Sequence, residues 1–342
     1  MRALSTTDVE DILRQLYGVS ASANQLRGEL DLNFHVRTDS GDQYLLKIYP
    51  PGRDGSVLDL QNKALAYLES TAPDLCIPRV VTTQSGDEIG VWVDATGTAR
   101  STRLLTWLSG KLWAEAKPDV TKSGPELGAF LAKLDKTLVN FSHPTMVRDY
   151  LWGLQQIGRQ LEVIEQIEPV AMRETVGKVI SRLTNDLSPQ LAVLPKQVIH
   201  NDANDHNIVL EADGSLVGLI DFNDMLYSYR ASELAVACAY AMLDQSDPVG
   251  AVLPMVAAYH ADNPLQEDEI ELLFDLIQGR IATSICMAAR QIVNDPDNEY
   301  LLVSQKPFRA LLEHLATENR ELAIYRFRDA CGLPANSNAP KI

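Results

Sequence analysis

Apolar and polar residues recur with two different periods along this chain, and the change of period divides it into two parts. The first part opens with a helical repeat over residues 5–17 and continues with strand-like alternation from about 24 to 49. A second helical segment covers 56–70. Short strand-like runs then follow, at 79–82, 88–94 and 99–106. Strands interrupted by a single helix predict a small α+β unit rather than a doubly wound sheet.

The second part has mostly helical periodicity. After Ser109-Gly110, apolar residues recur at helical spacing in long segments, at about 123–138, 145–165, 169–186, 231–243, 248–261, 267–293 and 303–329. The only clear strand pair predicted here joins 206–210 to 216–221, turned by Asp213-Gly214.

These periods predict the domain organisation. We expect an N-terminal unit over residues 1–105 and an interdomain connector at 106–110. A helical unit should cover 111–332. Residues 333–342 are rich in Pro, Asn, Ser and Ala, so we expect a disordered tail.

Composition narrows the class of partner. The 342 residues carry a formal net charge of −16, which argues against nucleic acid or an anionic membrane as partner and fits a cationic or zwitterionic small molecule. The four cysteines lack metal-cluster spacing, so we expect reduced thiols in the cytoplasm. Neither a secretory signal nor an apolar run near about 18 residues is visible, so no membrane span is predicted. The oligomeric state stays open.

The polar loop at 200–207, His-Asn-Asp-Ala-Asn-Asp-His-Asn, lies between two apolar runs. A second signal follows at Gly218-Leu219-Ile220-Asp221-Phe222, where an aspartate closes an apolar strand. A phosphoryl-transfer site needs a residue that orients or deprotonates a hydroxyl and two oxygen ligands that hold magnesium on a nucleotide. The alternative is a polar turn in which Asp and Asn side chains satisfy their own backbone.

The pattern His200-x-Asp202-x₄-Asn207, followed by Ile220-Asp221-Phe222, resembles the aminoglycoside phosphotransferase and choline kinase superfamily, relatives of the protein kinases. The resemblance implies a two-lobe, protein-kinase-like α+β fold with a small antiparallel-sheet N-terminal lobe and a mostly helical C-terminal lobe. It also implies that the N-terminal lobe, residues 1–105, binds the nucleotide and that the C-terminal lobe, residues 111–332, holds the catalytic and substrate sites. It makes Asp202 the catalytic base, Asn207 and Asp221 the Mg²⁺ ligands, and His200 a support of the loop. It also implies ATP or GTP as co-substrate.

Three positions depart from the superfamily pattern. Asn201 stands where glycine is usual, which should be tolerated if the backbone there is not left-handed. Asn223 also replaces a frequent glycine. Gln61 stands where the glutamate partner of a strand lysine is expected, which implies a Lys47–Gln61 hydrogen bond weaker than an ion pair. These departures keep open a nucleotide-binding, pseudokinase-like module as the alternative of another class.

Two segments of the first part are candidates for binding phosphates. By the resemblance, Lys47 contacts the α- and β-phosphates; otherwise it is a lysine that extends its head to solvent from an edge strand. The segment Gly28–Phe34 lies where a phosphate-covering loop belongs, and Gly28, Asp31 and Asn33 are its candidate contacts. An ordinary hairpin loop is the alternative.

The connector between the two parts is the candidate purine site. Backbone groups of such a connector can pair with a purine edge, with apolar side chains around it. Thr106, Trp107 and Leu108 are therefore the expected nucleotide contacts. The alternative is a simple transition from strand to loop.

Finer motifs are similar to one branch of the superfamily. The segment Gly-Glu-Leu-Asp-Leu-Asn-Phe at 28–34 looks like the loop of hydroxylysine kinases and of kinase halves fused to some aminotransferases. The segments 58–62, 103–110 and 220–225 agree with that branch. We therefore expect a small hydroxylated amine or amino acid as acceptor, with 5-hydroxylysine first. An aminoglycoside, homoserine, or choline and ethanolamine are the alternatives.

Three further residues, Asp205, Asp224 and Trp152, are candidates for contact with the acceptor, and His206 lies beside the first of them. Asp205 is a candidate for a substrate amine, and His206 is expected to be a structural hydrogen-bonding histidine. Asp224 contacts either the substrate or a second metal, or else caps a turn. Trp152, placed on the predicted 145–165 helix, either packs in the core or contacts the substrate.

Overall fold

The computed structural model describes residues 4, 6–26, 31–94, 96–294 and 305–334. Gly28 lies outside these residues, as does the predicted tail from residue 335 onward. The chain forms two compact units. The N-terminal unit contains Met1–Ser109, His143–Thr145 and Gly218–Asn223, and the helical unit contains Gly110–Ser142, Met146–Val217 and Asp224–Ile342.

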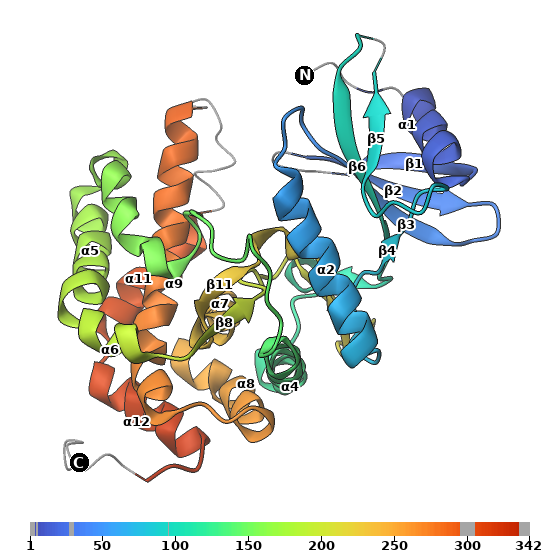
Figure 1. Cartoon of the computed structure of the whole chain (residues 1–342). Coiled ribbons are helices and arrows are strands. Elements are labelled where there is room, and N and C mark those ends of the chain that lie inside the picture. The colour runs from blue at the N-terminus through green and yellow to red at the C-terminus, as the bar shows by residue number, and fades with distance from the viewer. Residues whose placement is uncertain (1–3, 5, 27–30, 95, 295–304, 335–342) are drawn as a thin grey trace. The chain divides into compact units, whose positions relative to one another are not determined.

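A six-stranded antiparallel sheet forms the centre of the N-terminal unit (Figure 1). Its strands follow the order β1-β2-β3-β6-β4, and β5 pairs with β6. Their bounds are β1 Ala21–Leu26, β2 Leu32–Thr38, β3 Gln43–Ile48, β4 Val80–Val81, β5 Gly90–Val93 and β6 Ala99–Thr106. The order places β3 between β2 and β6, so β3 is an interior strand.

Alternation along β2 and β3 buries one face of this sheet. Phe34 and Val36 of β2, with Leu46 and Ile48 of β3, lie in a core cluster. Helix α1, Thr6–Ile12, and the π-helical turn Leu13–Tyr17 that continues it contribute Val9, Ile12, Leu13 and Tyr17 to that cluster. Helix α2, Gly55–Thr71, starts at Asp54, whose side chain accepts a hydrogen bond from Ser56 N as an N-cap.

The helical unit contains most of the helices of the described chain. Their bounds are α3 Trp113–Ala116, α4 Val120–Leu138, α5 Val170–Ser181, α6 Ser188–Val193, α7 Ala231–Ala241, α8 Pro248–Asp262, α9 Glu267–Asn294, α11 Lys306–Thr317 and α12 Arg320–Ala330. Irregular helical turns are η2 Leu154–Gln166 (3₁₀), η3 Arg182–Asp186 (π) and η4 Phe222–Asp224 (3₁₀). The prediction of an α+β fold with an antiparallel sheet and a helical remainder is confirmed.

Short strands accompany these helices. A three-stranded sheet follows the order β10-β9-β7, with β7 Lys111–Leu112, β9 Ile208–Leu210 and β10 Leu216–Leu219. A second pair, β8 Lys196–Ile199 with β11 Leu226–Tyr229, was not predicted. These strands are four residues long and pair across about thirty intervening positions, so local periodicity does not reveal them.

Helix α9 is the core helix of its unit. Its segment Glu267–Ile292 is long and apolar enough to cross a membrane by composition alone, but 89% of its most apolar window is buried inside the protein. Burial against the neighbouring helices therefore accounts for its apolar composition.

The predicted helix at 145–165 is wrong over its first half. Only η2 is helical there, and the preceding residues form turns. Tyr227 N donates to Met146 O, and Arg148 Nε donates to Met225 O at 3.0 Å. These bonds hold the segment against residues 225–227, so its backbone does not form a helix.

The predicted single helix at 303–329 is also wrong. Residues 303 and 304 lie outside the described chain, and the remainder forms two helices, α11 and α12. Asn319 separates them, because its side chain accepts a hydrogen bond from Leu322 N and caps α12.

Close packing of α4 against α8 gives a test of the fold. A Cβ on Gly128 of α4 would lie 2.2 Å from the carbonyl oxygen of Met255 in α8, so Gly128→Ala must push two helices apart. We expect this variant to lose about 1–3 kcal/mol of unfolding free energy in urea titrations. Gly177→Ala in α5 is the matched control, since its Cβ would meet nothing within 4 Å. It should gain about 0.5–1 kcal/mol, and equal effects at the two sites would contradict the packing argument.

Candidate active site

The loop at 200–207 is a tight turn between β8 and β9. Asn204 N donates to the carbonyl of Asp202 at 2.7 Å, and Asn207 N donates to the carbonyl of Asn204 at 3.0 Å. The side chain of Asn204 accepts from His206 N at 2.8 Å. The Asp and Asn residues that the sequence singles out are therefore held in one compact turn.

Three side chains donate to the carboxylate of Asp202. Arg280 Nη2 lies 2.8 Å and Asn204 Nδ2 lies 3.0 Å from Oδ1. Asn207 Nδ2 lies 2.7 Å from Oδ2. The Asp202 side chain is 18% exposed, so the carboxylate is held in one orientation and still reaches solvent. This arrangement favours its ionised form.

The amide of Asn207 is oriented by the same turn. Its Nδ2 also donates to the backbone carbonyl of Asp202, at 2.9 Å. Because both contacts use the nitrogen, the amide oxygen Oδ1 is the atom that Asn207 can offer to a cation.

Two buried side chains hold the backbone beneath Asp202. His200 Nδ1 accepts a hydrogen bond from Asp202 N at 3.2 Å, and Glu233 Oε2 of α7 accepts one from Asn201 N at 2.9 Å. Burial raises the pKa of Glu233 to about 7, although the backbone donors of Asn201 and His200 oppose the shift. The loop is thus anchored to α7 through a carboxyl group.

The backbone at Asn201 is left-handed, which is the conformation in which asparagine in place of glycine is expected to be less well tolerated. Its φ is +67°, which lies in the left-handed region. Asn is enriched there because its short polar side chain tolerates this conformation better than most residues. The side chain is fully buried, and neither its Nδ2 nor its Oδ1 has a hydrogen-bond partner.

Aromatic side chains surround the loop within the helical unit. The Trp152 ring lies 4.6 Å from the guanidinium carbon of Arg280, and Tyr150 OH donates to Asp224 Oδ1 at 2.5 Å. Burial and the neighbouring Asp224 raise the pKa of Tyr150. Trp152 was placed on a helix; it lies instead in the turn before η2.

Asp205 and His206 pair with each other. His206 Nδ1 lies 3.0 Å from Asp205 Oδ1, and this bond raises the pKa of His206. The backbone carbonyl of Asp205 accepts from Ala114 N at 2.8 Å.

Lys47 and Asp221 form an ion pair within the N-terminal unit. Lys47 Nζ lies 3.2 Å from Asp221 Oδ1, and their side chains are 3% and 38% exposed. Burial by itself lowers the pKa of Lys47, but Asp221, Tyr49 and Asp31 together outweigh it and the net pKa is raised. Lys47 is buried on the interior strand β3, so the alternative of a lysine reaching solvent from an edge strand is wrong.

Gln61 of α2 does not take the partner predicted for it. Its Oε1 accepts a hydrogen bond from Arg103 Nη1, and Arg103 Nη1 also lies 3.2 Å from Tyr49 OH. Arg103 is opposite Lys47 in the β3–β6 register. The buried guanidinium reaches Gln61 from there, while Lys47 donates to Asp221.

The other nucleotide candidates of this unit are distributed over β2 and the end of β6. Asn33 pairs with Lys47 in the β2–β3 register. Burial raises the pKa of Asp31, and the charge of Lys47 opposes this. Thr106 Oγ1 accepts from Arg79 N at 2.8 Å.

Residues 107 and 108 follow directly after β6. The Trp107 ring packs 4.2 Å from that of His35. Leu108 lies against Gly218, whose absent Cβ would be 2.9 Å from Leu108 Cδ2.

Arg103 and Arg280 were missed by the sequence reasoning. Both guanidinium groups are buried, Arg103 in a sheet and Arg280 in α9. For Arg280 the available signal was an arginine inside an apolar segment of the predicted helix, Leu276-Ile277-Gln278-Gly279-Arg280-Ile281-Ala282. A buried charge there must have a partner, and buried charges cluster at functional sites.

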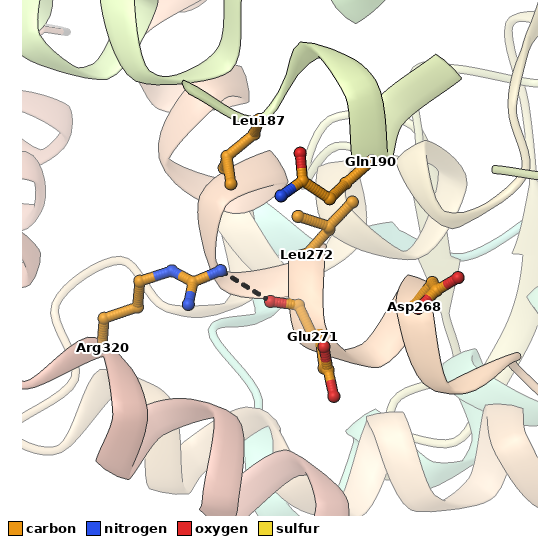
Figure 2. Close-up of a pocket in the computed structure, with 6 residues that line it drawn as sticks. All are labelled: Leu187, Gln190, Asp268, Glu271, Leu272 and Arg320. Carbon is orange, nitrogen blue, oxygen red and sulfur yellow. Dashed lines mark hydrogen bonds between the residues drawn. The ribbon is translucent and has the colours of Figure 1, made fainter. Parts of the chain in front are cut away.

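Clusters of metal-binding side chains and a pocket in the helical unit are the other features that bear on ligand binding. No group of three or more His, Cys, Asp or Glu side chains among the described residues could hold a metal ion. A pocket of about 180 Å³ in the helical unit is smaller than ordinary ligand sites, which start at about 300 Å³. Figure 2 shows the residues that line it, which are Leu187, Gln190, Asp268, Glu271, Leu272 and Arg320. None of these six is a predicted site residue.

Comparison with known proteins identifies the family. The phosphotransferase enzyme family matches residues 23–270. Hydroxylysine kinase of Danio rerio is 27% identical over 330 residues, covering 92% of this chain and 91% of the relative. Hydroxylysine kinase of Xenopus laevis is 28% identical over 332 residues, covering 89% and 87%.

A solved structure agrees with the fold. An amicoumacin kinase in complex with AMP-PNP, Ca²⁺ and Ami superimposes with a TM-score of 0.71 at 15% identity, covering 93% of this chain and 97% of that one. The chain belongs to the phosphotransferase enzyme family. It is an enzyme of that class with a protein-kinase-like fold, and the predicted resemblance to hydroxylysine kinase-like phosphotransferases is confirmed.

The anchor at Glu233 generates a pH prediction. In the unfolded chain this carboxyl ionises near 4.5, whereas in the folded protein its pKa is about 7. Its stabilising contribution is therefore complete below pH 4.5 and is lost as the pH rises through 7, by an amount on the order of 3 kcal/mol.

Glu233→Gln, which stays neutral, should show a smaller fall in Tm than the wild type between about pH 5 and about pH 8. Glu211→Gln, at an exposed position, is the control and should follow the wild-type curve. Parallel curves for all three proteins would contradict the prediction. The measurement is thermal unfolding followed by circular dichroism across that pH range.

Proposed function

We propose that this enzyme transfers the γ-phosphoryl group of ATP or GTP to a hydroxyl of a small amine or amino acid, with 5-hydroxylysine as the first candidate. The observation that carries the proposal is the carboxylate of Asp202, which three donors hold in one orientation. A general base must be ionised and held in position before the hydroxyl arrives, and this arrangement supports both conditions.

Asn207 and Asp221 are the proposed magnesium ligands. Magnesium prefers hard oxygen ligands and is commonly held by one or two protein groups together with waters and substrate phosphates. The Asn207 amide is turned so that its oxygen Oδ1 can bind a metal ion, and the Asp221 carboxylate is 38% exposed. Both groups therefore fit such a cation. When bound, Mg²⁺ neutralises charge on the β- and γ-phosphate oxygens.

Lys47 is the proposed phosphate ligand of the N-terminal unit. Its raised pKa keeps it charged, and it can exchange part of its contact with Asp221 for a phosphate oxygen. Gly28, Asp31 and Asn33 are proposed to cover the phosphates.

The segment after β6 is proposed to meet the purine. Thr106, Trp107 and Leu108 supply both backbone groups and an aromatic side chain there.

The acceptor contacts are proposed around the aromatic side chains of the helical unit. Asp205 and Asp224 offer carboxylates to a substrate amine, and the ring of Trp152 offers a face that attracts cations. The formal charge of −16 favours an acceptor with positive charge. Free thiols at all four cysteines fit a reaction in the reducing cytoplasm.

The likeness to hydroxylysine kinases over most of the chain supports 5-hydroxylysine above the other acceptors. Homoserine, an aminoglycoside, and choline or ethanolamine share the hydroxyl and the amine. A pseudokinase-like binding module would bind nucleotide without turnover, yet Asp202, Asn207, Asp221 and Lys47 are all present.

Asp202→Ala should abolish turnover while leaving nucleotide affinity close to that of the wild type. A general base contributes about 10²–10⁴-fold, so kcat should fall by at least about 10²-fold. Asp213→Ala, in an exposed turn, is the control and should keep wild-type kcat. Turnover by Asp202→Ala near the wild-type rate would refute the assignment. The measurements are steady-state release of nucleoside diphosphate and nucleotide binding by calorimetry.

The acceptor is tested by a panel. Release of ADP or GDP should be measured with 5-hydroxylysine, homoserine, choline, ethanolamine and an aminoglycoside, each with ATP and with GTP. We expect 5-hydroxylysine to give the highest kcat/KM, since hydroxylysine kinases match up to 92% of this chain. If none of these acceptors raises release above the water background, the small-amine kinase proposal fails.

A further inference from the structure

Arg280 brings a buried guanidinium from the middle of α9 to the carboxylate of Asp202. Its Nη2 lies 2.8 Å from Asp202 Oδ1, and Nη1 lies 3.5 Å from the backbone carbonyl of Asn201. The Arg280 side chain is 1% exposed. One residue therefore contacts both the proposed base and the strained backbone that precedes it.

Aromatic rings from two other elements fix the guanidinium. The Trp152 ring, from the turn before η2, lies 4.6 Å from its carbon, and the Tyr240 ring of α7 lies 5.6 Å away. Tyr240 OH is also 3.5 Å from Nη2. Contacts of a cation with aromatic faces are favourable and restrict the plane of the guanidinium, so Arg280 has little freedom to leave Asp202.

Stability alone does not explain an arginine at this position. Removing a guanidinium from water costs several kcal/mol, and apolar residues of similar volume often serve a core equally well or better. Arg280 Nε is buried without a hydrogen-bond partner, which adds to that cost. A functional role of the charge at the carboxylate of Asp202 would account for an arginine that is costly to bury.

The charge on Arg280 is secure. Burial by itself lowers the pKa of the guanidinium, but Tyr240, Asp202 and Asp224 together outweigh that effect and the net pKa is raised. Other charged or titratable groups nearby are His200, Asp205, Asp224, Glu233, Arg148, Tyr150 and Tyr240. The guanidinium of Arg280 is a strong positive charge in direct contact with Asp202.

We propose that Arg280 is a positioning residue for phosphoryl transfer, which holds the Asp202 carboxylate in the orientation that the acceptor hydroxyl needs. The inference rests on the proposed role of Asp202. Trp152 and Tyr240 act one step further away, because they keep the guanidinium plane in place. Loss of Arg280 removes a donor that holds the carboxylate, so the orientation of the carboxylate becomes less restricted.

The test compares Arg280→Met, Arg280→Lys and Arg280→Ala with the wild type. For Arg280→Met we expect kcat to fall by about 10-fold or more. The KM for nucleotide should not change, because Arg280 contacts the proposed base and not the proposed phosphate ligand. Arg280→Lys keeps the charge without the planar fork, so kcat should be only partly retained. Added guanidinium ion at millimolar concentration should raise the rate of Arg280→Ala.

Arg290→Met is the matched control on the same helix. The Arg290 guanidinium pairs with Glu162 at 3.3 Å, so its loss should leave both kcat and the KM for nucleotide as in the wild type. Circular dichroism and thermal melting report whether each variant is folded. If Arg280→Met and Arg280→Ala melt below the assay temperature, Arg280→Lys decides the question through its kcat and its KM for nucleotide.

Two outcomes separate this inference from the proposed function. Wild-type kcat in folded Arg280→Met, or in Arg280→Lys where that variant decides, overturns the positioning role. A rate that falls only in proportion to the folded fraction, without rescue by guanidinium ion, overturns it as well. Activity retained by Asp202→Ala overturns the proposed function itself, whatever the Arg280 variants do.

Discussion

The ion pair between Arg280 and Asp202 ties the core helix α9 to the loop at 200–207, and the geometry of that loop depends on it. Because α9 is packed against its neighbours, it holds the guanidinium of Arg280 in a fixed position. The guanidinium in turn restricts the orientation of the Asp202 carboxylate. Asn204 and Asn207 complete the set of donors from within the loop. The orientation of the proposed base is thus determined from the core outward.

Backbone strain accompanies both carboxylates of the proposed chemistry. Asn201, directly before Asp202, has φ +67°, and Asp221 itself has φ +62°. Such conformations persist only where the surroundings enforce them, and they concentrate at functional sites. Glu233 enforces the first by accepting Asn201 N, and Lys47 holds the second through the Asp221 carboxylate. The left-handed backbone at position 201 is therefore kept although the residue is asparagine and not glycine.

Much of the fold was predictable because its signals are local. The alternation along β2 and β3 and the helical period of α2 are properties of consecutive residues, and these elements form where predicted. The segment 145–153 was not predictable in this way. Met146 and Arg148 bond to residues of the Met225–Tyr227 segment, about eighty positions later, and those bonds override the helical pattern.

The sequence by itself determined the elements with strong local periodicity, the family, and the turn that brings Asn207 to Asp202, because five residues of chain cannot separate them far. Only the tertiary structure decided the partners of the buried charges. Lys47 pairs with Asp221 across 174 positions, Arg280 with Asp202 across 78, and Arg103 with Gln61 across 42. A buried charge takes whichever compensating group the packing brings within hydrogen-bond reach, and that choice has no local signature in the chain.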